Sequence, residues 1–210
     1  MAPLIWYFDF ISPFAYLQWR RMGDLPAGVR VEYRPVLFAG LLDHWESRGP
    51  AEIPAKRVFT YRYVHWYAAR AGIELKIPPA HPFNPLPALR LALALDASAE
   101  AIGRIFDFVW RDGRSIDDVP AWNALAATLG VIDAQAAVSA PGVKARLRAN
   151  TAEAIGRGVF GVPTFVAGDQ LFWGVDATDM LLDYLREPER FSTGEFARAA
   201  TLPAAAERRR

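Results

Sequence analysis

The 210-residue sequence contains no cysteine. This absence excludes structural disulfides, metal sites built on thiolates and catalysis by a thiol of the chain itself. The three histidines, His44, His65 and His81, are scattered without the spacing of a zinc-binding helix or finger, so we expect no metal site. Any sulfur chemistry of this protein must therefore use a sulfur atom that a ligand brings in.

The sequence also lacks a long apolar run and an excess of one charge. No run approaches the roughly 20 residues of a membrane span, and the N-terminus has no basic region followed by an apolar core and a small-residue cleavage site. The 24 basic and 23 acidic residues nearly balance, which gives no reason to expect nucleic acid or an anionic membrane as a partner. With 52% hydrophobic residues, the chain can bury a substantial core. We therefore expect a cytoplasmic, soluble protein.

The first part of the chain has the pattern of a β-α-β unit. Residues 4–10, LIWYFDF, predict a short buried strand that ends at Ser12-Pro13. Residues 14–25 predict an amphipathic helix, with Ser12 as its N-cap and Pro13 in its first turn. The alternation from 29 to 33 predicts a second strand, which the crossover makes parallel to the first.

The middle of the chain changes character. From about 40 to 155 we find no strand of comparable strength, and helices rich in Ala, Leu and Arg alternate with proline-rich connections. The densest connection is IPPAHPFNPLP, residues 77–87. The predicted helices cover residues 61–72, 86–97, 100–111, 119–129 and 145–156.

Strand character returns near the C-terminus. Residues 164–166 and 170–173 predict a hairpin, and 176–185 predict a closing helix with Asp176 as N-cap. A β-α-β unit followed by β-β-α is what a thioredoxin-like sheet requires, so we predict an α/β, thioredoxin-like fold with a large all-helical insertion. The expected parts are a thioredoxin-like domain (1–38 and 157–190), an inserted helical domain (39–156) and a partly disordered C-terminal tail (191–210).

Ser12 lies at the junction of strand and helix where a disulfide oxidoreductase would carry C-P-x-C, but the residues here are Ser12-Pro13-Phe14-Ala15. The simpler interpretation is an ordinary N-cap, worth about 1 kcal/mol. The functional interpretation is that a hydroxyl at a helix N-terminus donates a hydrogen bond to a ligand's thiolate and lowers the pKa of that thiol. A serine nucleophile is disfavoured, because no G-x-S-x-G turn surrounds Ser12.

Two C-terminal motifs allow a structural and a functional interpretation. Val162-Pro163-Thr164 either begins an edge strand or contains a cis Val-Pro bond that offers backbone groups to an extended peptide. Trp173 to Asp176 either ends a strand at an N-cap or forms a site in which Asp176 holds the ammonium of a γ-glutamyl group. Backbone N–H groups there would hold the adjacent carboxylate.

The insertion carries polar residues in its proline-rich connections. Lys56 and Asn84, with Phe83 beside Asn84, are either solvated loop groups or groups that face an acidic aromatic substrate. Trp66 and Tyr67 are expected in the core.

These segments together resemble the 2-hydroxychromene-2-carboxylate isomerases, glutathione-dependent enzymes related to the kappa-class glutathione transferases and to the DsbA family. The similarity runs in consistent order from about residue 4 to 185. The matching segments are FDFISPFAYL, YRPVLFAGLL, GPAEIPAKR, HPFNPLPALRLALA and GVFGVPTFVAGDQLFWGVD.

The resemblance implies a homodimer with glutathione as cofactor, bound between the first helix, a cis-proline and the last helix. It makes Ser12 the residue that activates the glutathione sulfur. It places Leu42, Glu52, Ile53 and Phe83 or Asn84 where the substrate lies, so these join Lys56 as substrate candidates. The implied glutathione contacts are Ser12, Val162, Pro163, Thr164, Phe165, Trp173, Gly174, Val175 and Asp176.

The implied reaction interconverts 2-hydroxychromene-2-carboxylate, a small aromatic carboxylate, and trans-o-hydroxybenzylidenepyruvate in aromatic compound degradation, without net redox change. Two alternatives stay open: a kappa-class-like glutathione transferase acting on other electrophiles, and a non-catalytic thioredoxin-like binding protein. Two departures from the family pattern bear on glutathione affinity. Ala177 follows Asp176 where many relatives have Asp-Arg, and Ser47-Arg48 precede Gly49 where relatives often have an asparagine.

Overall fold

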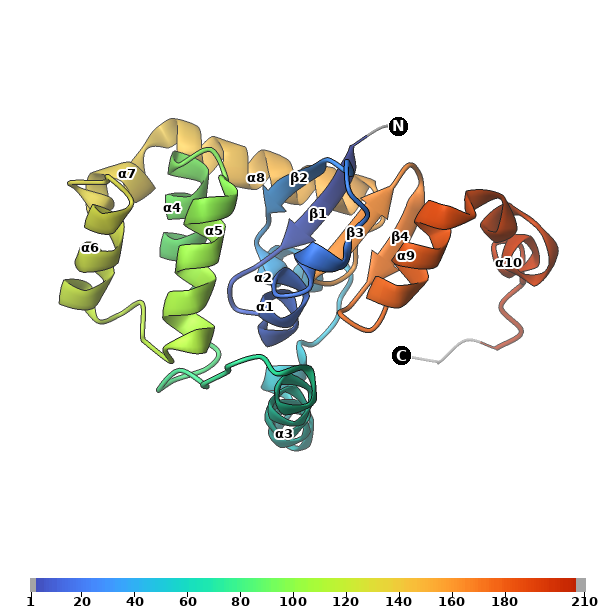
Figure 1. Cartoon of the computed structure of the whole chain (residues 1–210), viewed down its shortest axis with the longest axis horizontal. Helices are drawn as coiled ribbons and strands as arrows, with labels where there is room; N and C mark the ends of the chain where they lie inside the picture. The colour runs from blue at the N-terminus through green and yellow to red at the C-terminus, as the bar shows by residue number, and fades with distance from the viewer. Residues whose placement is uncertain (1–2, 207–210) are drawn as a thin grey trace.

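The computed structural model describes residues 3–206 and contains a four-stranded sheet in the order β2-β1-β3-β4 (Figure 1). Strand β1 (Leu4–Phe8) pairs in parallel with β2 (Val31–Pro35) and antiparallel with β3 (Thr164–Ala167). Strand β3 pairs antiparallel with β4 (Gln170–Trp173). This is the sheet that the β-α-β and β-β-α patterns predict, and within residues 3–206 no strand interrupts the helical block between β2 and β3.

The helices surround this sheet, and several differ from their predicted bounds. Helix α1 ends at Trp19, before Gly23 and Pro26, and α3 begins at Pro54, because proline is favourable in a first turn. The helices are α1 (Pro13–Trp19), α2 (Phe38–His44), α3 (Pro54–Ala71), α4 (Leu86–Ala94), α5 (Ala99–Phe106), α6 (Val119–Thr128), α7 (Ala134–Ser139), α8 (Pro141–Gly156), α9 (Thr178–Arg186) and α10 (Gly194–Ala199). Shorter turns are η1 (Met22–Asp24), η2 (Pro50–Glu52), η3 (Asp107–Arg111) and η4 (Pro188–Ser192).

Strand β1 is buried on both faces of the sheet. Because side chains alternate along a strand, Leu4, Trp6 and Phe8 enter the larger hydrophobic cluster, and Ile5 and Tyr7 enter a smaller one on the opposite face. The larger cluster continues through the helical block into α4, α5 and η3. The predicted insertion therefore shares one continuous core with the sheet, and the division into two domains stays a prediction.

Helix α8 covers the smaller cluster and leads the chain back to the sheet. The Asn150 side-chain amide donates to the Pro35 carbonyl at 3.0 Å, and the Leu37 N–H donates to the Thr151 hydroxyl at 3.0 Å. The Tyr7 hydroxyl donates to Glu153 at 2.9 Å across the same face. These bonds join α8 to the ends of β1 and β2, so the loop that follows α8 enters the sheet at a defined place.

Helix α3 stands apart from the sheet, below it in Figure 1. Only Val64 and Ala68 of this helix are fully buried, whereas Phe59 and Trp66 are 67% and 53% exposed. The expectation that Trp66 lies in the core is therefore wrong, because one narrow stripe of α3 faces the protein and Trp66 lies outside it. Tyr67 is half-buried.

The segment expected as a partly disordered C-terminal tail contains, within residues 191–206, the end of η4 and the whole of α10, and Phe191 is buried. The last four residues, 207–210, lie outside the described part of the chain. Among residues 3–206, no helix has both the length and the apolar character to cross a membrane.

Candidate functional site

Ser12 begins helix α1 as predicted. Its hydroxyl oxygen accepts a hydrogen bond from the Ala15 N–H at 3.3 Å, which is the N-cap bond, and its own N–H donates to the Asp9 carbonyl at 3.1 Å. Pro13 occupies the first turn. The Ser12 residue is 7% exposed, so the hydroxyl lies at the boundary between the core and the surface.

The Ser12 hydroxyl meets the Val162 carbonyl, which lies 150 residues away in the sequence. The peptide bond between Val162 and Pro163 is cis, as the functional interpretation of this motif expected. The hydroxyl donates to the Val162 oxygen at 3.4 Å, which is long for an O–H···O bond. Since a serine hydroxyl rotates and this bond is weak, its hydrogen can turn to a stronger acceptor such as a thiolate.

Helix α1 is shorter than predicted, which changes how an anion would be stabilised beside Ser12. Its seven residues form about two turns. Few peptide dipoles are therefore aligned along this helix, and the macrodipole at its N-terminus is small. The Ser12 hydroxyl and the first-turn N–H groups therefore contribute more than the helix as a whole.

Asp9 is a buried functional group that the sequence reasoning missed. Its carboxylate accepts from the Ile11 N–H at 3.0 Å and from the Phe38 N–H at 2.9 Å, so it joins the loop before Ser12 to the start of α2. Complete burial raises the pKa of Asp9 to about 7, although its backbone hydrogen bonds act in the opposite direction. The available signal was one charged residue inside the apolar run LIWYFDFI.

The Trp173 motif lies beside the cis-proline. The Gly174 N–H donates to the Pro163 carbonyl at 2.8 Å, and the Trp173 indole packs directly against Gly161, where a Cβ atom would collide with it. The Phe160 ring lies 5.0 Å from the Trp173 ring, between centroids, and Trp173 is 53% exposed. Ser12, the cis-proline and the Trp173 motif are therefore neighbours, and of these residues Trp173 is the exposed one.

Gln18 supports this surface from beneath and was also missed by the sequence reasoning. Its amide oxygen accepts from the Trp6 indole at 2.7 Å. Its amide nitrogen donates to the Gly174 carbonyl at 2.9 Å and to the Thr178 hydroxyl at 3.1 Å. Gln18 thus joins α1 to the start of α9. A polar residue on the otherwise apolar face of a predicted helix was the only signal for it.

Most of the implied glutathione contacts are buried residues, namely Ser12, Val162, Pro163, Thr164, Phe165 and Val175. Phe165 and Val175 belong to the larger hydrophobic cluster, and the Thr164 hydroxyl donates to the Gly161 carbonyl at 2.8 Å. Asp176 is exposed, but it is not the N-cap that we predicted. Helix α9 begins at Thr178 with Ala177 as N-cap, because the chain first turns at Gly174, whose φ is +90°.

The substrate candidates form two groups. Leu42 and Glu52 meet around Gly49, where an added Cβ atom would lie 3.2 Å from Leu42 and 3.4 Å from Glu52. Ile53 is half-buried at the N-cap of α3, and Lys56 is exposed in the first turn of that helix.

The second group lies in the connection before α4. The Phe83 ring packs against His81 and Trp110 at 5.8 and 6.5 Å between centroids. Asn84 is exposed and accepts from the Leu86 N–H at 3.1 Å. The His81 ring contacts the Ile11 carbonyl at 2.7 Å, which brings this connection against the loop that carries Ser12.

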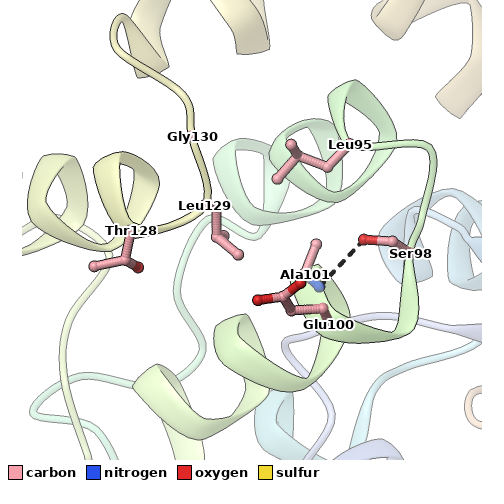
Figure 2. Close-up of a pocket in the computed structure, with 7 residues that line it drawn as sticks. All are labelled: Leu95, Ser98, Glu100, Ala101, Thr128, Leu129 and Gly130. Atoms are coloured by element: carbon pink, nitrogen blue, oxygen red, sulfur yellow. Dashed lines mark hydrogen bonds between the residues drawn. The ribbon is translucent and has the colours of Figure 1, made fainter.

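An open pocket of about 410 Å³ lies elsewhere, between the ends of α4, α5 and α6 (Figure 2). Ser98 lines this pocket. Its hydroxyl caps α5 by accepting a hydrogen bond from the Ala101 N–H at 3.3 Å. None of the predicted site residues lines this pocket. The lining residues are Leu95, Ser98, Glu100, Ala101, Thr128, Leu129 and Gly130.

Comparison with known proteins finds related sequences over most of the chain. The model of the DSBA-like thioredoxin domain family matches residues 4–186. A 2-hydroxychromene-2-carboxylate isomerase of Sphingobium xenophagum is 31% identical over 188 residues, which cover 85% of this chain and 95% of that protein. A glutathione S-transferase kappa 2 of Caenorhabditis elegans is 27% identical over 87% of this chain and 91% of its own.

Solved structures agree with this similarity. The structure of a 2-hydroxychromene-2-carboxylate isomerase superposes with a TM-score of 0.76 at 25% identity, covering 95% of this chain and 99% of that one. The cytosolic disulfide reductase DsbM of Pseudomonas aeruginosa, solved with GSH, shares the fold with a TM-score of 0.58 at 18% identity, covering 95% and 98% of the two chains. The predicted thioredoxin-like fold with its helical insertion is thereby confirmed. The chain belongs to the DsbA-like thioredoxin-domain family and, within it, to the 2-hydroxychromene-2-carboxylate isomerases.

Proposed function

We propose that this protein is a glutathione-dependent isomerase that interconverts 2-hydroxychromene-2-carboxylate and trans-o-hydroxybenzylidenepyruvate. The observation that carries the proposal is the Ser12 hydroxyl, which lies against the carbonyl before a cis-proline in a chain that has no cysteine. The family supports the substrate class, because relatives named for this isomerase match along most of the chain.

The residues around Ser12 fit an extended thiol peptide such as glutathione. The Gly174–Pro163 bond joins the cis-proline turn to the segment that carries the exposed Trp173 and the exposed Asp176. In this proposal, backbone groups beside Val162 and Gly174 would hold the peptide, and Asp176 would hold its ammonium group. A kappa-class transferase among the relatives and a GSH-bound structure of the same fold support this cofactor.

The chemistry of the chain itself is hydrogen-bond donation to sulfur. The Ala15 N–H donates to the Ser12 oxygen, and the Ser12 hydroxyl donates to the Val162 carbonyl in this structure. A bond from this hydroxyl to an ionised thiol lowers the pKa of that thiol. Bound glutathione would supply a thiolate that adds to a conjugated double bond and leaves again, which permits rotation without net redox change.

The side chains of the insertion would hold the aromatic carboxylate. The half-buried Phe83 ring offers an apolar contact, and the exposed Lys56 and Asn84 offer a cation and an amide for a carboxylate. Leu42, Glu52 and Ile53 would complete this side. The proposal includes a cytoplasmic homodimer, for which the exposed Phe59 and Trp66 of α3 offer an apolar surface.

A kappa-class-like transferase is the second candidate, because it would use the same Ser12 and because a kappa transferase is among the relatives. The two reactions differ in outcome. An isomerase returns its thiol unchanged, whereas a transferase consumes glutathione in a stable thioether.

An absorbance assay of the chromene-to-pyruvate conversion, with and without glutathione, tests the proposal. We expect conversion only with glutathione, and no loss of free thiol at completion. Stoichiometric thiol loss with other electrophiles would support the transferase instead. Absence of both conversion and calorimetric binding at millimolar glutathione would support a non-catalytic binding protein.

A further inference from the structure

Trp110 of η3 contacts the chain immediately before Ser12. Its indole N–H, which can only donate, lies 2.7 Å from the Phe10 carbonyl. Its own carbonyl accepts from the Lys76 N–H at 2.7 Å, in the connection that follows α3. Both Trp110 and Phe10 are fully buried, so water cannot replace the indole at the Phe10 oxygen. The insertion therefore supplies a hydrogen-bond donor for a buried carbonyl two residues before Ser12.

The peptide unit between Phe10 and Ile11 is held at both ends. Trp110 donates to its carbonyl, and the Asp9 carboxylate accepts its N–H, which belongs to Ile11, at 3.0 Å. The two bonds leave one rigid plane in opposite directions, so the plane cannot rotate without weakening both. The Ser12 N–H, which donates to the Asp9 carbonyl at 3.1 Å, closes the turn. The place of Ser12 thus depends on the orientation of this peptide unit.

A wide helical turn carries Trp110 to this position. Residues Asp107–Arg111 form a π turn, in which the Asp112 N–H donates to the Asp107 carbonyl five residues earlier, at 2.8 Å. The Arg111 guanidinium donates to the Asp107 carboxylate at 2.6 Å and so closes the turn. Such turns are rare and occur frequently at functional sites. This one contains three consecutive buried residues, and the last of them is Trp110.

We propose that Trp110 is a positioning residue for Ser12. Its indole N–H fixes the Phe10–Ile11 peptide unit and thereby the place from which the Ser12 hydroxyl reaches a bound thiolate. This inference rests on the proposed role of Ser12 and adds one residue of the insertion to it. The insertion then contributes to the sulfur chemistry as well as to the binding of a substrate.

Loss of the indole N–H should act on Ser12 through the backbone. Among the described residues no other donor reaches the Phe10 oxygen, and leaving a buried carbonyl unpaired is unfavourable. Rotation of the peptide unit toward another donor would draw the Ile11 N–H away from Asp9 and move the Ser12 hydroxyl. A misplaced donor raises the pKa of the bound thiol and slows turnover, whereas glutathione still binds beside the cis-proline.

A tryptophan analogue separates this hydrogen bond from the packing of the ring. Benzothienylalanine has sulfur in place of the indole N–H and nearly the same shape. It is placed at position 110 alone, because the chain has seven tryptophans. The matched control places it at Trp122, a buried residue of the same insertion, whose ring packs against Phe108 at 5.9 Å between centroids. Within residues 3–206, no hydrogen bond joins the Trp122 indole to the turn before Ser12.

The first measurement needs no glutathione. Amide hydrogen exchange, followed by NMR, reports how firmly the Ile11 N–H is bonded to Asp9. With the analogue at 110 we expect Ile11 to exchange about tenfold faster, while the Val36 N–H, which bonds to the Phe8 carbonyl, keeps its rate. The analogue at 122 should change neither rate. Unchanged exchange at Ile11, or an equal increase at Ile11 and Val36, would overturn the proposal.

The second measurement is the isomerisation assay with glutathione. We expect the analogue at 110 to lower kcat about three- to tenfold and to change KM for glutathione less than about twofold. The pKa of the bound glutathione thiol should rise. The analogue at 122 should keep the wild-type values. A loss of stability at 110 with unchanged kcat and unchanged thiol pKa would show a merely structural role and contradict the proposal.

Ordinary substitutions repeat the comparison. Trp110→Phe and Trp122→Phe both leave a cavity and should both lower stability, but only Trp110→Phe should raise the pKa of the bound thiol. Equal thiol pKa values in the two variants would contradict the proposal. If the wild type does not respond to glutathione, the proposed function fails, and hydrogen exchange at Ile11 still decides whether Trp110 holds the turn before Ser12.

Discussion

The cis-proline side of Ser12 and the insertion side are held by different kinds of groups. On the first side, backbone carbonyls and a buried amide make the contacts: Val162 meets the hydroxyl, and Gln18 fixes the Gly174 turn. On the second side, the substrate candidates Glu52, Lys56 and Asn84 are exposed side chains in proline-rich connections or at the start of α3. Backbone groups and buried side chains hold a single geometry, whereas exposed side chains can be replaced at little cost to the fold. The first side is therefore suited to a fixed chemical task and the second to selecting a substrate.

Asp9 joins the loop before Ser12 to the start of α2, and changing it should have the largest effect on stability. Because burial raises the pKa of Asp9 to about 7, above its ordinary value of 3.8, the folded state favours the protonated carboxyl. Its contribution to stability is complete below about pH 3.8 and is lost as pH rises through about 7. Between about pH 5 and about pH 8 this group alone should reduce the free energy of unfolding by an amount on the order of 3 kcal/mol.

Urea unfolding of Asp9→Asn at the two pH values measures this contribution. The decrease in stability between them should shrink in the variant relative to the wild type. Asp169→Asn is the control, because Asp169 lies in the exposed turn between β3 and β4. If Asp9→Asn and the wild type lose the same stability as pH rises, Asp9 does not titrate in this range.

Ser12→Ala tests the chemical task of the cis-proline side. The variant loses a hydrogen-bond donor to the anionic sulfur, so kcat should fall about a hundredfold, which corresponds to about 2.7 kcal/mol. The pKa of the bound glutathione thiol should rise, and the absorbance of the thiolate measures this change. Loss of the cap should cost about 1 kcal/mol of stability.

Ser98→Ala separates these two effects. Ser98 caps α5 with the same 3.3 Å bond to the N–H three residues on, so its loss should cost similar stability. Its activity should stay at the wild-type value. Equal activities of the two serine variants would refute the role of Ser12.

Gly161→Ala disturbs the same side through packing. The added methyl group would collide with the Trp173 indole and displace it from the cis-proline surface, at a cost of about 2 kcal/mol. Because the Trp173 indole is displaced, the affinity for glutathione, measured by calorimetry, should also fall. Gly23→Ala is the matched control, since an added Cβ there meets no atom within 4 Å. Retained affinity in Gly161→Ala would place glutathione away from Trp173.

The same contrast explains what the sequence could predict. The strands, their order along the chain and the Ser12 cap follow from local patterns of apolar residues, Ser and Pro, and the structure confirms them. Asp9 and Gln18 were not predicted because their roles depend on partners such as Phe38 and Gly174, which are distant in sequence. No local pattern specifies those partners.

Errors of placement have a related cause. Trp66 was expected in the core and is exposed, because burial depends on which stripe of α3 faces the protein. Asp176 was expected to cap α9, but the turn at Gly174 moves the helix start to Thr178. Helices α2, α7 and α10 were not predicted; each has only six or seven residues, too few to show a clear period.

Of these variants, Asp176→Ala should change stability and glutathione affinity least. It tests whether the cis-proline side extends as far as Asp176. Asp176 is exposed and does not cap α9, so its removal should leave the stability nearly unchanged. An exposed carboxylate that pairs with a ligand ammonium contributes up to about 1 kcal/mol, so glutathione affinity should fall about three- to fivefold in calorimetry. Asp169→Ala removes the same charge at the far end of the β3–β4 hairpin and should not change the affinity. An equal loss of affinity in both variants would mean that only the net charge of the protein matters. Asp176 would then not contact glutathione, and the glutathione site would extend no further than Trp173.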